Sequence, residues 1–186
     1  MAIKIYIDQG HNPENPNAGA EGNGLREQDI TYRVGEELAE LLRANPNYEV
    51  RLSRPTPTTS LGSSNSTSLR ARVNDANAWG ADYFISIHTN SSENPSANGI
   101  EAFSYAGGTS AFRLGESILQ SLSAATGQRN RGMKVRPGLY VLRRTAMPAI
   151  LLEIGFISNP EEAALMNSNP ALFARGIYNG IVAQLG

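Results

Sequence analysis

The chain contains only two histidines, His11 and His88, and each follows a short apolar run of strand length. His11 comes after Ile3–Ile7 and a tight turn, and His88 closes Tyr83–Ile87. Ligands of open parallel sheets bind in the crevice outside the carboxyl ends of the strands. We therefore expect the two imidazoles to converge at that edge, although a single histidine is more often a structural residue than a metal ligand.

Glu27 adds a carboxylate to this pair. It precedes Ile30 by three residues and Val34 by seven, so in a helix it lies on the apolar stripe. A buried carboxylate is costly unless it is paired or bound to a metal. The alternative is an acid in the first helical turn that faces solvent. Two nitrogens and one oxygen match a catalytic zinc site with an open fourth position, so we predict that His11, Glu27 and His88 bind one Zn²⁺.

Glu153 interrupts the apolar run Ala149–Phe156, again near the end of an expected strand. A structural alternative is an ion pair with Arg143 or Arg144. Burial among aliphatic neighbours would instead raise the pKa of Glu153, which suits a group that accepts and then returns a proton. We predict that Glu153 is the catalytic residue.

The elements that would position these side chains alternate between strand and helix along the chain. The expected strands are Ile3–Ile7, Glu49–Leu52, Tyr83–Ile87, Ile100–Ser104, Leu139–Leu142 and Ala149–Ile154. Helical periodicity covers Leu25–Asn45, Leu69–Trp79, Ser110–Thr126 and Pro170–Leu185, and Asn159 and Pro160 mark the start of a further helix. This alternation predicts an α/β domain with a largely parallel sheet covered on both faces.

Three segments have the composition of loops: Asn12–Gly24, Ser53–Ser68 and Thr89–Asn98. The first two exceed ordinary loop lengths, and long loops are often functional or mobile. For the serine- and threonine-rich Ser53–Ser68 we favour a flexible insertion.

Composition limits the possible functions of the chain. Its 186 residues predict one domain, 1–186, and a net charge of −1 argues against a nucleic-acid partner. There is no cysteine for a disulfide or a thiolate ligand, and no apolar stretch long enough for membrane insertion. The amino terminus enters a strand at once, which leaves no room for a signal peptide.

Taken together, several segments resemble the zinc-dependent N-acetylmuramoyl-L-alanine amidases of the amidase-3 type, which occur as autolysins, sporulation enzymes and phage endolysins. The matching segments lie in the family's order and are Ile5–His11, Leu25–Glu27, Leu69–Asn77, Ala81–Ile85, Ser86–Asn90, Arg131–Lys134 and Pro148–Asn159. Two departures are Asn12-Pro13, where the family has glycines, and Ser53-Arg54, where it has Thr-Arg. Both concern the surroundings of the site, so they leave substrate detail open.

The resemblance implies His11, Glu27 and His88 as zinc ligands and Glu153 as the catalytic carboxylate. It implies a mostly parallel, roughly six-stranded twisted sheet with helices on both faces. The expected reaction is hydrolysis of the amide between N-acetylmuramic acid and L-alanine in peptidoglycan. Zinc would polarise the carbonyl and acidify a water, while Glu153 moves the proton.

Other residues have two interpretations each. Asp8 could orient a metal-bound histidine, but turn formation is the simpler explanation. Asn90 could hydrogen-bond the substrate, with loop structure as an equal rival. A basic run could meet carboxylates of a stem peptide, although such runs are usually solvated. The run comprises Arg129, Arg131, Lys134 and Arg136.

Two other functions stay open at this point: another zinc peptidoglycan peptidase such as a carboxypeptidase, and a non-catalytic cell-wall-binding module. We expect peptidoglycan as the partner, and either a monomer or one part of a larger protein with a wall-targeting module. We also expect action outside the cytoplasm on the cell wall, as a released endolysin, a mother-cell lysin or an excised domain.

Overall fold

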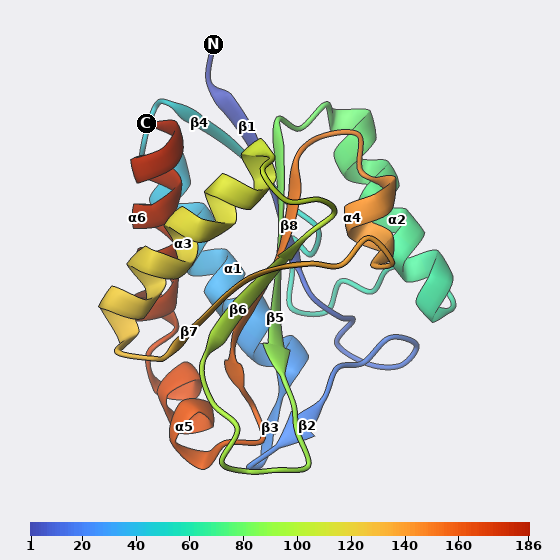
Figure 1. The fold of residues 1–186 in the computed structure, drawn as a ribbon. Coiled ribbons are helices and arrows are strands. Elements are labelled where there is room, and N and C mark those ends of the chain that lie inside the picture. Colours follow the sequence, from blue (N-terminus) through green and yellow to red (C-terminus); the bar gives the residue numbers. More distant parts are fainter.

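Strands and helices alternate along most of the chain, and the computed structural model describes residues 1–186 (Figure 1). The strands are β1 (Ile3–Gln9), β2 (Glu21–Gly22), β3 (Leu25–Arg26), β4 (Tyr48–Leu52), β5 (Tyr83–Asn90), β6 (Ile100–Ser104), β7 (Asn130–Val135) and β8 (Ala149–Phe156). The helices are α1 (Glu27–Arg43), α2 (Asn65–Trp79), α3 (Ser110–Thr126), α4 (Tyr140–Arg144), α5 (Pro160–Ser168) and α6 (Pro170–Leu185).

Six strands form the main sheet in the order β4-β1-β5-β8-β6-β7. All neighbouring pairs are parallel except β6 and β8, which run antiparallel. This confirms the mostly parallel six-stranded sheet. The antiparallel pair has a consequence for the site, because it sets Glu101, near the start of β6, directly opposite Glu153.

The two faces of the sheet have separate cores, as the alternation of side chains in a strand requires. On one face Ile5 and Ile7 of β1 pack with apolar side chains of α1, α3 and α6. On the other face Tyr6 packs with Val73 of α2 and Leu142 of α4. Figure 1 shows α3 and α6 on one side of the sheet and α2 beside α4 on the other. The expected coverage of both faces is therefore confirmed.

One predicted strand is wrong, and three strands were not predicted: the two-residue strands β2 and β3, and β7. Leu139–Leu142 was expected to be a strand, but Tyr140–Arg144 forms the helix α4, which directs Val141 and Leu142 into the smaller core. The sixth strand is instead β7, at the edge of the sheet. Its residues are mostly polar and only partly buried, so it lacks the apolar run by which the other strands were found.

Other expected boundaries differ more modestly. Strand β5 continues past Ile87 to Asn90, so His88 lies inside the strand. Helix α2 begins at Asn65, where a capping box at Ser64 fixes its first turn. The cap expected at Asn159 is confirmed, since its side chain accepts hydrogen bonds from the first turn of α5. None of the helices has both the length and the apolar character that crossing a membrane requires.

Candidate metal centre

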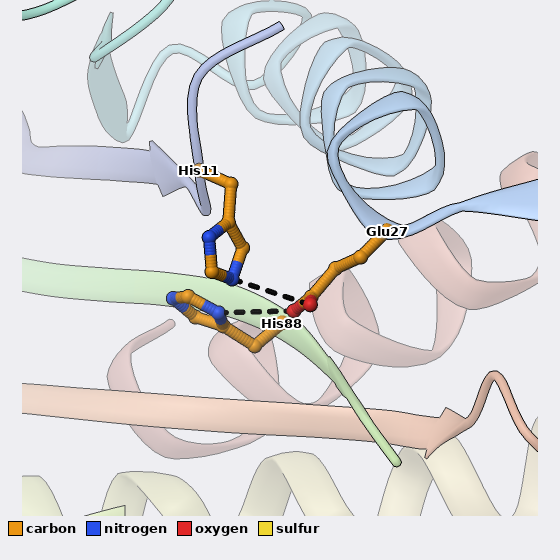
Figure 2. Close-up of side chains that lie close together, drawn as sticks. All are labelled: His11, Glu27 and His88. Atoms are coloured by element: carbon orange, nitrogen blue, oxygen red, sulfur yellow. Dashed lines mark hydrogen bonds and ion pairs between the residues drawn. The ribbon is translucent and has the colours of Figure 1, made fainter. Parts of the chain in front are cut away.

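His11, Glu27 and His88 come together at the carboxyl edge of β1 and β5, as the sequence predicted for their positions (Figure 2). The Nε2 atom of His11 lies 3.2 Å from Oε2 of Glu27, and Nδ1 of His88 lies 3.1 Å from Oε1. The two imidazole rings meet edge to face, with centroids 4.9 Å apart. One ligand atom from each residue falls within 4.8 Å of the others. Two nitrogens and one oxygen thus face a common point.

The carboxylate of Glu27 is held in place by the backbone around it. Glu27 is the first residue of α1 and only 3% exposed, so it does not face solvent. The amide of Thr89 donates to Oε1 at 2.9 Å, and the amide of Ala20 donates to Oε2 at 3.0 Å. Burial raises the pKa of Glu27, but hydrogen bonds from His11 and His88 outweigh it and hold the pKa below its usual range. The group is therefore an ionised carboxylate inside the protein.

Glycines allow the ligands to approach so closely. A Cβ on Gly10 would lie 2.6 Å from the ring of His88, and a Cβ on Gly19 would lie 2.8 Å from Oε2 of Glu27. Neither position can carry a side chain unless the ligands move. The hydroxyl of Thr31 on α1 donates to the carbonyl of Gly10 at 2.8 Å, which ties the end of β1 to the helix that carries Glu27.

His11 has a left-handed backbone with φ of 68°, which is uncommon for a residue other than glycine. Arg72 of α2 stabilises this backbone conformation. Its guanidinium donates to the carbonyl of Gln9 and to the carbonyl of His11, both at 2.6 Å. The strained backbone directs the imidazole towards Glu27, and such strain persists only where the surrounding structure enforces it.

Arg72 is 1% exposed and also bonds Oδ1 of Asp8 at 2.7 Å. Ser86 of β5 donates to the other carboxylate oxygen of Asp8 at 2.7 Å. Burial raises the pKa of Asp8, but the charge of Arg72 and these hydrogen bonds outweigh it and lower the pKa. Asp8 lies inside β1 and does not build the turn that the sequence favoured.

The segment 53–64 is anchored to the same region, which differs from the expected flexible insertion. Arg54 is 1% exposed and donates to the carbonyl of Gln28, while its amide donates to the side chain of Gln9. Asn12 accepts from the amide of Leu61 at 3.0 Å and donates to the carbonyl of Leu61 at 2.9 Å. Asn12, one of the departures from the family pattern, thus joins the two long loops.

Glu153 lies on β8 beside the three residues, and its backbone is the direct partner of His88 in the sheet. Its Oε2 atom is buried without a hydrogen-bond partner, and it forms no ion pair with Arg143 or Arg144. Burial raises the pKa of Glu153 to about 8, helped by the charges of Glu27 and Glu101. A carboxyl with such a pKa can exchange a proton near neutral pH.

Glu101 on β6, which is 5% exposed, was not among the predicted site residues. It accepts from Arg131 at 3.2 Å and pairs closely with Lys134. Asn90 donates to Glu101 at 2.9 Å, so the structure places its side chain against the protein; its substrate role stays a prediction. The signal that identified Glu153, an acid inside an apolar run, also marks Glu101 in Ile100–Ser104.

The donor set fits a divalent cation. The buried charge of Glu27 has no lysine or arginine partner, and only imidazole nitrogens and backbone amides face it. A dication at the point where the ligand atoms meet would neutralise that charge. The histidine side chains keep 21% and 18% of their surface exposed, which leaves the centre accessible from solvent. The Nδ1 atom of His11 is buried without a protein partner.

Comparisons with known proteins identify the family of this chain. The family model described as N-acetylmuramoyl-L-alanine amidase matches residues 5–183. The amidase CwlM of Bacillus licheniformis is 38% identical over 96% of this chain, and the sporulation-specific amidase of Bacillus subtilis is 36% identical over 96%. The chain spans 67% of the length of each relative. The catalytic domain of the amidase CwlV of Bacillus (Paenibacillus) polymyxa superposes with a TM-score of 0.85 at 31% identity, covering 98% of both chains.

Proposed function

This chain belongs to the N-acetylmuramoyl-L-alanine amidase family, and from that membership we propose that His11, Glu27 and His88 hold one zinc ion for its reaction. The reaction is hydrolysis of the amide between N-acetylmuramic acid and L-alanine in bacterial peptidoglycan. We propose Glu153 as the residue that transfers the proton.

The observation that carries this proposal is the common point faced by the three ligand atoms, next to a carboxyl that no cation neutralises. Two imidazoles and one carboxylate are a donor set that catalytic zinc sites use, with a fourth position open. Zinc is favoured over magnesium or calcium because those ions prefer ligand sets made of oxygen alone.

In the proposed mechanism each residue has a separate task. A bound zinc ion would supply Lewis-acid polarisation of the scissile carbonyl and would acidify water. Glu153 accepts the proton of the attacking water and returns it to the amine of L-alanine as the carbon–nitrogen bond breaks. Its raised pKa suits both steps, because the group must be a base first and an acid afterwards. Glu27 keeps its orientation through the amides of Ala20 and Thr89.

The direct test is the Glu153→Gln variant, with Glu161→Gln on the exposed first turn of α5 as the matched control. Glu153→Gln is expected to lose about 10²–10⁴-fold of its activity on purified cell walls while elemental analysis still finds one zinc per chain. A Glu153→Gln protein that digests walls as fast as Glu161→Gln would remove Glu153 from the mechanism.

Two measurements separate the rival functions. Mass analysis of digested muropeptides distinguishes an amidase from a carboxypeptidase, because only the amidase releases peptides with a free L-alanine amino group. Chelation followed by zinc addition distinguishes an enzyme from a wall-binding module, because only the enzyme loses and regains wall hydrolysis. For its native setting we propose one catalytic domain, 1–186, that acts on the cell wall as a monomer or within a larger protein.

A further inference from the structure

The basic residues around β7 do not form one uniform charged face, and the structure separates their tasks. Arg131 and Lys134 both pair with the buried carboxylate of Glu101. Arg131 additionally donates to the carbonyl of Asn98 and lies over the ring of Phe156. Both side chains are therefore already engaged in contacts within the protein.

Arg129 and Arg136 are the two remaining cations of the run. Arg129 lines a hollow of about 360 Å³ near the start of α5, where Glu161 and Glu162 provide acidic neighbours. Arg136 is exposed and lies over the ring of Phe103, with 5.0 Å between its guanidinium carbon and the ring centroid. No ion pair and no side-chain hydrogen bond involves the Arg136 guanidinium. It is thus a cation without an acidic partner.

Register in the sheet places Arg136 close to the proposed centre. Phe103 faces Leu151 across the β6–β8 pair, and Glu101 faces Glu153 two residues away. Residues two apart in a strand share a face and lie about 7 Å apart. The charge of Arg136 reaches Glu153, since it opposes the effect of burial on the pKa of that group. The free guanidinium therefore lies over Phe103, one position along the same face of β6 from Glu101, the residue opposite Glu153.

We propose that Arg136 is a binding subsite for a carboxylate in the peptide half of the substrate, about two residues from the scissile amide. This rests on the proposed function. The lactyl carboxyl of muramic acid is consumed in that amide, so any carboxylate near the bond belongs to the peptide. A guanidinium binds a carboxylate through two parallel hydrogen bonds. The ring of Phe103 fixes one face of the guanidinium and leaves its edge free.

The competing explanation is packing alone. An arginine stem can cover an apolar ring while its head stays in water, and Phe103 is only 6% exposed. The substitution Arg136→Gln retains part of the aliphatic side chain but removes the positive charge and the paired N–H donors of the guanidinium. Arg129→Gln is the matched control, because Arg129 is also exposed and belongs to the same basic run but lines a different part of the surface.

The experiment compares two probes that differ in one group, N-acetylmuramoyl-L-alanyl-L-alanine and its carboxyl-terminal amide. Wild-type protein with zinc is expected to favour the acid by about five- to tenfold in kcat/KM, mainly through KM, and the preference should shrink in high salt. Arg136→Gln should reduce the ratio to about one, and Arg129→Gln should keep it.

A wild-type ratio near one, or the same ratio in wild type and Arg136→Gln, would overturn the subsite. An equal loss of the ratio in Arg129→Gln would attribute the preference to general charge and would overturn it as well. The same two probes titrated into zinc-loaded Glu153→Gln protein, with and without Arg136→Gln, give an affinity ratio that does not depend on turnover. If neither probe is cleaved, digestion of purified walls still tests the proposed function, and this affinity ratio still decides the subsite.

Discussion

Two groups of charged residues, here called the first and second walls, lie on either side of the candidate centre and differ in how deeply they are buried. The first wall is the buried ion pair of Arg72 and Asp8, which bonds the backbone of His11, and both residues are 1% exposed. The second wall is Glu101 with Arg131 and Lys134 on β6 and β7, where the two cations keep 31% and 43% of their side-chain surface exposed. The first wall holds the backbone of His11, a proposed metal ligand, whereas the second lies next to Glu153, the proposed proton-transfer residue.

This difference indicates a division of labour. A buried ion pair is costly to break because the remaining charge has no partner, whereas a pair whose cations stay partly exposed contributes less. The first wall can therefore enforce the left-handed backbone of His11, and the second can vary without loss of the fold. Glu153 lies between them and is neutralised by neither, which keeps its pKa raised.

The largest effect is expected from Arg72→Met in the first wall. It should lower the free energy of unfolding by about 3–5 kcal/mol, because Asp8 is left as a buried unpaired charge. Zinc affinity should fall as well, since the carbonyl of His11 loses its donor. Arg131→Met in the second wall should cost about 1 kcal/mol or less. Denaturant unfolding of the metal-free proteins and competition titration with zinc measure both quantities; equal losses in the two variants would refute the division.

A smaller effect concerns the carboxyl between the walls. The folded pKa of Glu153, about 8, exceeds its unfolded value of about 4.3. The folded state therefore binds the extra proton, and this group makes stability fall as pH rises between these values. In metal-free protein, we compare the change in the free energy of unfolding that Glu153→Gln causes at two pH values. This change should be more stabilising at pH 8 than at pH 4.5, by about 2–4 kcal/mol. Unfolding curves across this range test it; an unchanged slope would argue against the buried acid.

The next smaller effect is expected from a glycine that lies against the candidate centre. Gly19→Ala would force a Cβ against Glu27 and His11, with an expected cost of about 1–3 kcal/mol and weaker zinc binding. Gly107→Ala is the control at the opposite end of β6, where a Cβ meets only Val135 at 3.9 Å. Thermal unfolding and zinc titration report the outcome, and a Gly19→Ala protein with unaltered zinc affinity would show that the ligands can readjust.

The smallest effect is expected from Glu101→Gln in the second wall. Burial raises the pKa of Glu101, but hydrogen bonds from Lys134 and Arg131 outweigh it and lower the pKa. Its contribution is present above the unfolded pKa of about 4.3 and is lost as pH falls through the folded value. The variant should therefore lose about 1 kcal/mol at neutral pH and nothing in strong acid. Unfolding measured at pH 7 and in acid tests this pH dependence. Its sign is opposite to that expected for Glu153, because Glu101 stabilises the fold at high pH and Glu153 at low pH.

The clustering of the three proposed ligand residues was predictable because each stands beside or within an apolar pattern. His11 and His88 follow apolar runs, and Glu27 lies on the buried stripe of its helix. Arg72 carries a similar signal, since it lies next to Val73 and three residues after Leu69 on a helix. Its partners come from distant segments, however, and a pattern within one helix does not identify them.

The errors in the fold have a related cause. The run Leu139–Leu142 has strand-like composition, and only its contact with α2 and the sheet selects a helix. Strand β7 has the opposite character, because a polar edge strand gives little apolar signal. In both cases tertiary packing decides between two local structures that the sequence alone leaves balanced.

The reversed direction of β6 constrains how relatives of this chain can diverge. Because β6 runs against β8, the segment 91–99 crosses the carboxyl end of β8 and returns beside Glu153. The segment after β6, 105–109, lies at the opposite end of the sheet. Insertions in the former would reshape substrate access, whereas insertions in the latter would leave it untouched. Changes in these two loops can therefore affect opposite ends of the molecule independently of each other.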